Sequence, residues 1–575
     1  MVTLWLMEIL VIAGGRGSGT GLGDSPNRHG NLDQAIAPHD NGYEKVFIVF
    51  IHSVSVRIVG MPPLVPLSDV ALHLSERDEV AIALRPLVAG TIIDIGEGLL
   101  PVTLRADIPQ SHKFALADIP EGAQVHKYGQ SIGRATHTVL AGDHVHSQNL
   151  GMDLTEREHE FGTTHTELTA PAGETPTFLG YPRADGRVGT RNYIGILTSV
   201  NCSATAANLI ADAFRGFALD EFENVDGVMA LTHTSGCGLV PTSEGGQVLL
   251  RTLQGYARHP NFGGLLVVGL GCEMVPVESL VEGYGLPEDT IVSTMNIQGE
   301  GGVRATVKEG IARIRAMLPE LNTRRRVPAP VSKLVLGLNC GGSDGFSGIT
   351  ANPALGVASD RLVSYGGTSV LAETPEVFGA EHLLTSRAVA PEVGQKLLDR
   401  IEWWKGYAEQ GGGSLDNNPS PGNKAGGLTT ILEKSLGAVA KGGQADLSAV
   451  YEYAEPVTEP GFVFMDTPGY DPVSVTGIIA GGATVVCFTT GRGSVFGAKP
   501  TPSIKIATNT AMYEKMADDM DLNAGRIVDG TATIAEVGEE IFDLIIRVAS
   551  GEQTVSEELG VGQEEFVPWQ FGTVT

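Results

Sequence analysis

Leu338-Asn339-Cys340-Gly341-Gly342-Ser343-Asp344-Gly345-Phe346-Ser347-Gly348 is the most informative segment of this chain. The run Leu334-Val335-Leu336-Gly337-Leu338 leads into it and predicts a strand. That strand ends in a loop with four glycines, a thiol, a carboxylate and two hydroxyls. Glycine allows positive φ and close approach of the backbone to a ligand. Open α/β sheets bind ligands at the carboxyl ends of their strands, so we expect a site here.

The same design recurs twice in the chain. Gly269-Leu270-Gly271-Cys272-Glu273 and Thr489-Thr490-Gly491-Arg492-Gly493 each follow an apolar run and combine glycine with a reactive or charged side chain. Three loops of this kind predict one composite site.

Composition limits the class of protein. The chain has 575 residues, of which 42% are hydrophobic and 18% charged, so we expect a globular protein of two to four domains. The net charge of −28 argues against nucleic acid or an anionic membrane as a partner. A small anionic substrate stays compatible with this charge, because a local basic pocket can outweigh the global field. The sequence is also compatible with a homo-oligomer.

Cysteine usage and the chain start indicate the compartment. The five cysteines are an odd, sparse set, which does not indicate a disulfide framework. No apolar run reaches the roughly 18 residues needed to span a bilayer. The first residues lack the basic region of a signal peptide. We therefore expect a cytoplasmic protein with reduced thiols.

The N-terminal part divides into an extension, a small domain and a linker. Residues 1–60 are expected to be a flexible or spurious extension, and the glycines at 14–21 lack the G-x-G-x-x-G spacing of a dinucleotide site. Without that fingerprint we expect no nicotinamide cofactor. Residues 69–150 alternate short β-like runs with Gly and Pro, which predicts a small β domain. Residues 151–178 are polar and aperiodic, as in a linker.

Beyond residue 178 the pattern predicts an α/β fold with mostly parallel sheets. Apolar runs predict strands at 194–200, 227–231, 265–270, 333–338, 368–372, 461–465 and 484–488. Helix-like segments at 204–214, 303–317 and 539–548 lie between or after them. We expect two α/β units, at 179–330 and 331–575. The Gly-, Asn-, Pro- and Ser-rich stretch 409–427 is expected to be a long functional loop.

Several motifs together resemble the altronate and galactarate dehydratases. The resemblance to their catalytic region is carried by residues 180–181, 184–192, 340–348, 349–353, 418–424 and 490–493. Residues 111–116 and 126–129 resemble that family's SAF (β-clip) domain. Altronate dehydratase is the more similar of the two at residues 102–105, 144–149 and 373–381.

The resemblance implies the removal of water from a sugar acid. D-altronate would give 2-keto-3-deoxy-D-gluconate in hexuronate catabolism, with galactarate or another aldonate or aldarate as the alternative substrate. It also implies ferrous iron, with manganese as a substitute. Two alternative functions belong to other classes of protein, namely a non-catalytic sugar-acid binding protein and a nicotinamide dehydrogenase. The reactive side chains at strand ends argue against the binding protein, and the missing G-x-G-x-x-G motif argues against the dehydrogenase.

The thiols are the first candidate metal ligands. Cys202, Cys237, Cys272 and Cys340 all lie at or just after predicted strand ends, and thiolates suit iron or zinc. Their spacing is unlike C-x-x-C, so buried cysteines acting as small hydrophobes are the alternative. An iron–sulfur cluster is left open beside a single ion. Cys487 lies inside a predicted strand and is expected in the core.

Acidic residues near these thiols extend the candidate metal set. Glu273 follows Cys272, and it is expected to bind metal or donate a proton, with a helix cap as the alternative. The same alternatives apply to Asp344, which we place among the catalytic residues. One of Glu373, Glu376 and Glu381 is also expected to bind metal.

The remaining candidates are catalytic or substrate-binding. His233 follows an apolar run and is expected to be a base or a metal ligand, with a structural histidine as the alternative. Arg492 and Lys424 lie in glycine-containing loops and are expected to bind the substrate anion, with Lys424 also a candidate base. Ser343, Asn352, Asn423 and Arg191 are expected to bind substrate.

Three histidines stand out in the predicted β domain. His144 and His146 are two residues apart and would face the same side of a strand. We expect these two histidines and His112 to bind a metal ion or to contact the substrate as part of a lid. The alternative is that they are exposed to solvent. We include His112 in the candidate metal set.

Overall fold

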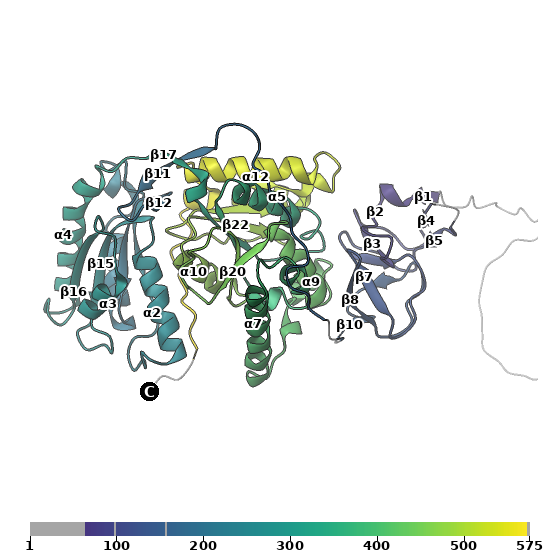
Figure 1. Ribbon diagram of the computed structural model, residues 1–575, viewed down its shortest axis with the longest axis horizontal. Helices are drawn as coiled ribbons and strands as arrows, with labels where there is room; N and C mark the ends of the chain where they lie inside the picture. The colour runs from purple at the N-terminus through teal and green to yellow at the C-terminus, as the bar shows by residue number, and fades with distance from the viewer. Residues whose placement is uncertain (1–63, 97–98, 154, 156–157, 572–575) are drawn as a thin grey trace, which may run out of the picture. The chain divides into compact units, whose positions relative to one another are not determined.

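The computed structural model describes residues 64–571 apart from 97–98, 154 and 156–157. The extension expected at residues 1–60 lies outside the described residues. Figure 1 shows a small β-rich part followed by two α/β parts, which confirms the predicted fold class. We call them the β domain (64–153), the middle domain (177–330) and the C-terminal domain (331–571). Among the described residues no helix is both long and apolar enough to cross a membrane.

The β domain consists of short strands in three small sheets. One sheet has the order β2-β3-β6-β9 and the others have the orders β10-β8-β7 and β1-β4-β5. The strands are β1 (Leu64–Pro66), β2 (Ala71–Leu72), β3 (Val80–Ala83), β4 (Ile92–Asp94), β5 (Val102–Thr103), β6 (Lys113–Ala115), β7 (Gln124–Lys127), β8 (Gln130–Ala135), β9 (His144–Val145) and β10 (Leu150–Gly151). β9 pairs with β6, and this places His144 opposite Phe114. The described residues between β10 and β11 form no helix or strand.

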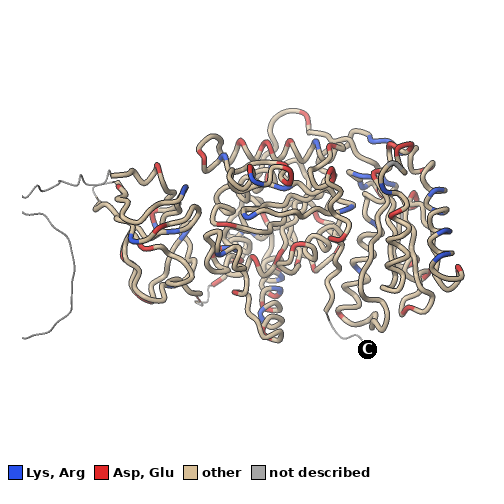
Figure 2. The backbone as a smooth tube through the Cα atoms, turned by 180° about the vertical axis from the view of Figure 1, so that it is seen from behind, with Lys and Arg blue, Asp and Glu red and all other residues tan. Residues whose placement is uncertain are grey.

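The middle domain is a four-stranded parallel sheet between two layers of helices. Its strand order is β14-β13-β15-β16, with β13 (Tyr193–Thr198), β14 (Gly227–Leu231), β15 (Phe262–Gly269) and β16 (Ile291–Asn296). Helices α1 (Ala204–Asp212) and α4 (Val303–Leu321) pack on one face, and α2 (Glu244–Ala257) and α3 (Val277–Tyr284) on the other. Figure 2 shows basic residues along α4. β11 (Thr177–Pro182), β12 (Val188–Gly189) and β17 (Val327–Pro330) form a separate antiparallel sheet.

The C-terminal domain is built around a seven-stranded parallel sheet with the order β20-β21-β19-β18-β22-β23-β24. The strands are β18 (Val335–Cys340), β19 (Thr368–Leu371), β20 (Leu447–Tyr451), β21 (Gly461–Met465), β22 (Val485–Thr490), β23 (Ser503–Ala507) and β24 (Leu522–Asn523). The chain runs from β18 to one side, through β19, and later crosses to β22 on the other side. The strand order therefore reverses beside β18, which is where such sheets bind ligands.

Helices cover both faces of this sheet and connect it to the middle domain. α5 (Ala351–Ser364) and α12 (Ile534–Ala549) pack together on one face. α10 (Asp471–Gly481) lies on the other face and packs against α2, so the cores of the two α/β domains are continuous. α7 (Pro391–Gln410) precedes the segment predicted as a long loop. That segment contains the short helix α8 (Pro421–Ala425), which Ser420 and Asn423 cap reciprocally.

Candidate active site at the strand ends of the C-terminal domain

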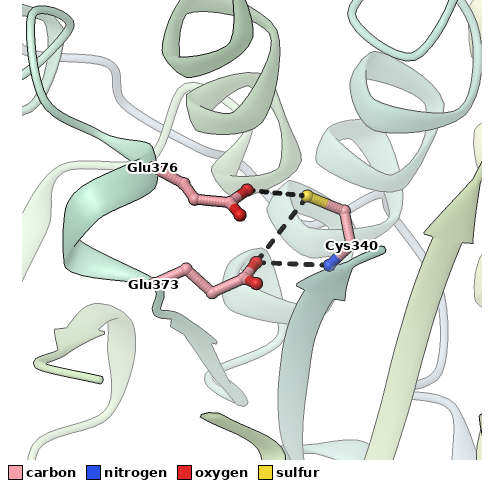
Figure 3. A group of neighbouring side chains, drawn as sticks. All are labelled: Cys340, Glu373 and Glu376. Carbon is pink, nitrogen blue, oxygen red and sulfur yellow. Dashed lines mark hydrogen bonds between the residues drawn. The ribbon is translucent and has the colours of Figure 1, made fainter. Parts of the chain in front are cut away.

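Cys340 is the last residue of β18, and two glutamates follow the neighbouring strand β19 (Figure 3). The Cys340 thiol lies 3.7 Å from Glu373 Oε2 and 3.6 Å from Glu376 Oε2. The backbone N–H of Cys340 donates to Glu373 Oε2 at 3.3 Å. Glu373 has a φ of 72°, a left-handed conformation that non-glycine residues rarely adopt and that often marks functional sites. All three side chains are buried.

Two lysines complete this group, which we call the Cys340 cluster. Lys441 Nζ lies 2.9 Å from the Cys340 sulfur and 3.0 Å from Glu373 Oε2. Lys434, on α9 (Ile431–Val439), donates to Glu376 Oε1 at 2.7 Å and to Asn418 at 2.9 Å. Buried charges need partners of opposite sign, and each of these ions has one.

Burial changes the proton affinity of the cluster. Burial, reinforced by the charge of Glu376, raises the pKa of Glu373 to about 8. The same two causes raise the pKa of Asp471, at the start of α10, to about 7. Burial raises the pKa of the Cys340 thiol to about 12, although Lys441 opposes this shift. Strong shifts of this kind, in a cavity and with named charge partners, are typical of functional sites.

The Cys340 cluster opens into a cavity of about 340 Å³, which we call the Cys340 cavity. Apart from glycine, its walls carry only polar or ionisable side chains. The lining residues are Cys340, Gly341, Gly342, Glu376, Asn417, Asn418, Ser420, Asn423, Lys434, Gly469, Tyr470 and Asp471. A Cβ at Gly341 would lie 2.2 Å from Asp471 Oδ2, so glycine is needed there for the carboxylate to reach the wall. Such walls suit a small ligand with many hydroxyls and a charge.

The donor set of the cluster fits a divalent metal ion. Within the described part of the chain, Cys340, Glu373 and Glu376 are the one group of His, Cys, Asp or Glu ligand atoms that all lie within 4.8 Å of one another. Glu373 Oε1 is buried and has no hydrogen-bond partner, which leaves a free ligand atom. Glu373, Glu376 and Asp471 bring one more negative charge than the two lysines balance when the carboxylates are ionised. One thiol and two carboxylates suit iron, manganese or zinc.

Of the predicted substrate ligands, Ser343 has the freest side chain. Its hydroxyl is buried without a hydrogen-bond partner, in a small cavity that it shares with Cys340 and Lys434. The Asn352 side chain donates a hydrogen bond to the carbonyl of Gly437 and accepts one from the hydroxyl of Thr489. Asn423 caps α8 and donates to the Ser343 carbonyl, so it shapes the wall of the Cys340 cavity.

Asp344 and Arg492 lie together on the other side of the glycine-rich loop. They line a second cavity of about 410 Å³, and Gly342 O accepts hydrogen bonds from the backbone of Gly491 and Arg492 between the two cavities. Asp344 accepts bonds from Ser347, Thr508, Asn509 and the Phe346 N–H. Burial raises its pKa, although these bonds oppose the shift. Arg492 is exposed.

The three histidines of the β domain do come together. Their ring centroids are 5.1 to 5.3 Å apart, and His112 Nδ1 lies 2.9 Å from His144 Nε2. His112 Nε2 is 3.2 Å from the Ala425 carbonyl, and His146 Nε2 is 2.8 Å from that of Lys424. The histidines therefore contact the backbone of α8, whose other side lines the Cys340 cavity. Metal binding by His112 and a catalytic role for the Lys424 side chain stay predictions.

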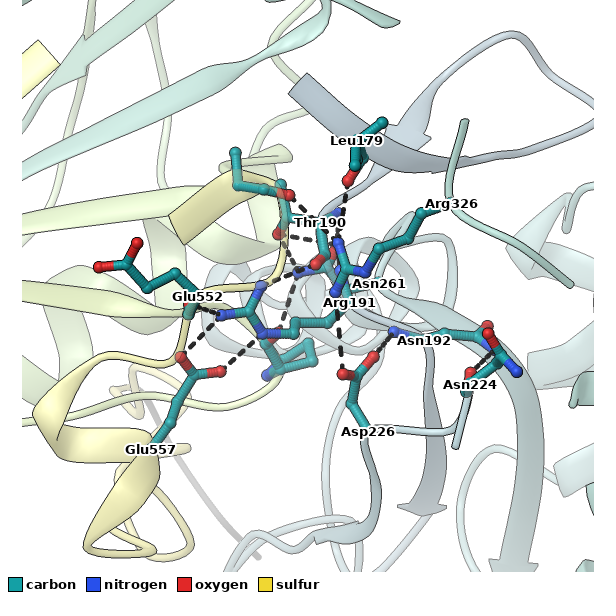
Figure 4. Close-up of polar contacts among 12 residues, drawn as sticks. Leu179, Thr190, Arg191, Asn192, Asn224, Asp226, Asn261, Arg326, Glu552 and Glu557 are labelled. Carbon is teal, nitrogen blue, oxygen red and sulfur yellow. Dashed lines mark hydrogen bonds and ion pairs between the residues drawn. The ribbon is translucent and has the colours of Figure 1, made fainter. Parts of the chain in front are cut away.

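Arg191 was predicted to bind substrate, and the structure gives it a structural role instead (Figure 4). A guanidinium has five N–H donors. In Arg191 they bond to both carboxylate oxygens of Glu557 and to the carbonyls of Thr190, Val548 and Glu552. The side chain is 2% exposed and has no donor left for a ligand. It ties the middle domain to the C-terminal helices.

The predicted composite site is divided between two domains. The loops at 338–348 and 489–493 adjoin, because Gly341 N donates to Thr489 O at 3.1 Å. The loop at 269–273 belongs to the middle domain, as do Cys202 and Cys237. Glu273 accepts bonds from Ser199 and Gly271, which with other hydrogen bonds lower its pKa despite burial. The candidate metal ligands therefore lie in three places, namely the Cys340 cluster, the middle domain and the histidine group.

His233 lies in the middle domain with both ring nitrogens engaged. Nε2 is 3.0 Å from Thr198 O, and Nδ1 accepts from Ser235 N at 3.3 Å. These bonds fit a neutral ring, and burial lowers its pKa. The ring lines a cavity that does not include Cys340. A role for His233 as a base stays a prediction.

Sequence reasoning missed Lys434, Lys441 and Asp471. A signal was present in the segment 431–441, where two lysines stand among Ile, Leu, Ala and Val in a run that predicts a buried helix. A lysine on a buried face needs a partner, and that requirement could have pointed to Glu373 and Glu376.

The fold and the Cys340 cavity define an α/β protein with a polar cavity at the strand ends of its C-terminal domain. Three family models match the chain. They are the altronate/galactarate dehydratase SAF domain at residues 69–153, the second domain of D-galactarate dehydratase/altronate hydrolase at 180–322, and the C-terminal part of D-galactarate/altronate dehydratase at 331–574. The chain therefore belongs to the altronate/galactarate dehydratase family, as the motifs predicted.

Individual relatives support the same assignment. Galactarate dehydratase (L-threo-forming) of Escherichia coli (strain K12) is 39% identical over 85% of this chain and 95% of its own length. Altronate dehydratase of the same strain is 38% identical over 84% of this chain and 95% of its own length. Altronate dehydratase of Bacillus subtilis (strain 168) is 35% identical over 85% of this chain and 96% of its own length. The family is one of sugar-acid dehydratases.

Proposed function

We propose that this chain removes water from a sugar acid in a metal-dependent reaction at the Cys340 cavity. D-altronate is the first candidate substrate, and its product would be 2-keto-3-deoxy-D-gluconate. The observation that carries the proposal is the arrangement of Glu376, Lys434 and Asp471 in one polar cavity at the reversal point of a parallel sheet.

The chemistry sets what the site must supply. The bonds that break are C2–H and C3–OH, and the resulting enol becomes the ketone at C2. The C2 proton is weakly acidic because the neighbouring carboxylate is already an anion. The site must therefore stabilise extra negative charge on that carboxylate while a base takes the proton.

The side chains can be assigned to these tasks by position. Asp471 faces the cavity from the start of α10 and is the candidate to move the C2 proton. The Lys434 ammonium, 2.7 Å from Glu376, is placed to bind a substrate oxygen and to neutralise developing charge. Cys340, Glu373 and Glu376 would hold the metal ion, which when bound supplies Lewis acidity toward the substrate carboxylate. Ser343 is a further candidate for binding a hydroxyl.

Iron is the proposed metal, with manganese as a substitute. The mixed thiol and carboxylate donors of the Cys340 cluster support this choice, because thiolate favours the softer ions and carboxylate excludes none of them. Chelation should remove activity, and ferrous iron with a reductant should restore it. A chelator-insensitive enzyme would contradict the metal requirement.

Galactarate is the second candidate substrate. The 39% identity to a galactarate dehydratase is similar to the identity to the altronate enzymes, so overall identity does not separate the two. The local resemblance at residues 102–105, 144–149 and 373–381 favours altronate.

A substrate panel tests the proposal. Altronate, galactarate, mannonate and gluconate would be incubated anaerobically with the ferrous-loaded protein, and 2-keto-3-deoxy acid formation would be measured. We expect the fastest turnover with altronate. A preference for galactarate would retain the reaction and replace the substrate, and no product from any of the four would contradict the proposal.

A further inference from the structure

Three thiols of the middle domain lie at the carboxyl ends of three adjacent parallel strands. Cys202 follows β13, Cys237 follows β14 and Cys272 follows β15, and the strand order is β14-β13-β15. Parallel strands bring their carboxyl ends to one edge of the sheet, with neighbouring strands roughly 4.8 Å apart. The thiols therefore share one edge.

Hydrogen bonds join the three loops that carry these thiols. Asn201, next to Cys202, donates its backbone N–H to Ser235 O at 2.9 Å and its side chain to His233 O at 3.2 Å. Ser199 donates to Glu273, next to Cys272, at 2.8 Å. The loop of β13 thus contacts the loops of both neighbouring strands.

The loop conformations depend on glycine and leave the thiols open to solvent. Gly236 and Gly238 flank Cys237 with φ of 100° and 66°, and Gly271 precedes Cys272 with φ of 113°. A Cβ at Gly236 would lie 2.5 Å from Ser199 O, so another residue would push the loops apart. All three cysteines are exposed. Free cysteine is among the most buried residue types, so three exposed thiols on one edge need an explanation.

A cavity of about 510 Å³ adjoins these loops. Asn201, Thr232, His233 and Thr234 line it from the loops of β13 and β14, and Tyr470 lines it from the C-terminal domain. Tyr470 also lines the Cys340 cavity, so the two cavities meet at this side chain. The thiol edge therefore lies beside a cavity that adjoins the candidate active site.

We propose that Cys202, Cys237 and Cys272 together hold an iron–sulfur cluster. Thiolates are the usual ligands of such clusters. A single ion would need its ligand atoms as close together as those of the Cys340 cluster, and these thiols are not in such a group. A cluster presents several iron atoms and accommodates thiolates that are farther apart.

Three cysteines lie at this edge, and the other two of the chain, Cys340 and Cys487, are buried in the C-terminal domain. The nearby His233 has both nitrogens in hydrogen bonds. In a four-iron cluster held by these three cysteines, one iron would have no cysteine ligand and would be available to a small molecule. When a preformed cluster is transferred from a small-thiol complex, the three cysteines replace three of its thiolate ligands. The three thiol protons pass to the leaving thiolates, and no electron is transferred. This site stands apart from the proposed function, because it uses none of the residues of the Cys340 cluster.

Anaerobic transfer of a preformed iron–sulfur cluster from a small-thiol complex to the full chain tests the inference. Iron and acid-labile sulfide would be counted per chain, and visible absorption and electron paramagnetic resonance of the reduced protein would be recorded. We expect a cluster spectrum in the wild type. Cys202→Ser, Cys237→Ser and Cys272→Ser should each lose most of the sulfide and the signal, with circular dichroism unchanged.

Cys340→Ser serves as the matched control. It should lose turnover but keep the cluster spectrum and the bound sulfide, which separates failure of the proposed function from failure of this inference. A Cys202/Cys237/Cys272 triple serine variant that binds as much iron and sulfide as the wild type would overturn the inference. So would a protein that takes up zinc and no sulfide, or one in which two of these thiols form a disulfide.

Discussion

The strand ends of the C-terminal domain and of the middle domain follow the same plan but are covered differently. In both, a parallel sheet ends in glycine-containing loops that carry a cysteine. Cys340 is buried, whereas Cys202, Cys237 and Cys272 are exposed. Around Cys340 lie Glu373, Glu376 and Lys441 of its own domain. The β domain packs over the loop that follows Cys340, where Lys127 donates to Gly345 O at 3.2 Å.

One carboxylate joins the β domain to the C-terminal domain. Glu433 accepts hydrogen bonds from Lys113 at 2.8 Å and from Lys127 at 3.0 Å, and all three side chains are fully buried. One carboxylate cannot neutralise two ammonium groups, and burial lowers the pKa of Lys113 to about 8. The comparison teaches that the same kind of strand-end loop becomes a buried, low-dielectric site when neighbouring side chains cover it, and charges interact strongly there.

The largest expected effect comes from removing a charge at the covered strand ends. Lys434→Ala should reduce turnover by about 10²- to 10⁴-fold, since an ammonium that faces the cavity is lost and Glu376 keeps only uncharged partners, the Asn418 amide and the Cys340 thiol. Steady-state kinetics on altronate measures this. Lys308→Ala, at an exposed position on α4, is the control. Equal turnover in the two variants would contradict the role of Lys434.

Removing the carboxylate that holds the β domain should have the next largest effect. Glu433→Gln leaves two buried lysines without a counter-ion and should lower the free energy of unfolding by about 3–5 kcal/mol at neutral pH. Chemical denaturation measures this. A loss as small as that of an exposed ion pair would show that the β domain is held by other contacts.

The same carboxylate gives a pH dependence. Burial opposes ionisation of Glu433, but Lys113 and Lys127 outweigh it and hold its pKa below the usual range. A lowered pKa in the folded state gives stability that is present above the unfolded value of roughly 4.3 and is lost as the pH falls below it. The stability difference between wild type and Glu433→Gln should therefore shrink on acidification. A difference that grows toward low pH would contradict this assignment.

A smaller effect is expected where Arg191 joins the domains. Arg191→Ala removes a buried ion pair with Glu557 and should cost about 3 kcal/mol of stability, with the KM for substrate unchanged. Arg187→Ala breaks a more exposed pair with Asp185 and should cost less than about 1 kcal/mol. A raised KM in Arg191→Ala with unchanged stability would restore its predicted role in substrate binding.

The smallest effect is expected at the cap of α8. Ser420→Ala removes a reciprocal cap beside the Cys340 cavity and should cost about 1 kcal/mol, with a higher KM. Thr554→Ala removes the same kind of cap from α13 (Val555–Glu558), which does not line the cavity. It should cost similar stability with KM unchanged. Equal KM values in both variants would show that α8 does not shape the site.

Much of the fold could be predicted because apolar runs ending in glycine mark buried parallel strands. β14 and β21 have the predicted bounds, whereas β16, β20 and β23 were not predicted. β23 contains Lys505, whose ammonium is buried against Ser556 and the Phe496 carbonyl, so its sequence does not appear apolar enough for a buried strand. Local pattern cannot reveal a partner that lies far along the chain.

The site was predictable to the extent that its residues follow strands. Cys340 and the glutamates after β19 could be named for this reason. Lys434 and Lys441 stand on or just after an apolar helix, which indicates burial. Their acidic and thiol partners lie 58 to 101 residues away, so the sequence pattern did not identify these pairs. Arg191 was misassigned for the same reason, since Glu557 is 366 residues distant.

The proposed function is the removal of water from a sugar acid bound in the Cys340 cavity. The most direct test is to compare ferrous-loaded wild type with Glu376→Gln, which keeps the size of the side chain and removes its charge. Anaerobic turnover of altronate would be followed as 2-keto-3-deoxygluconate. We predict product from the wild type and almost none from Glu376→Gln in a protein that is still folded. Equal rates in both proteins would contradict the account.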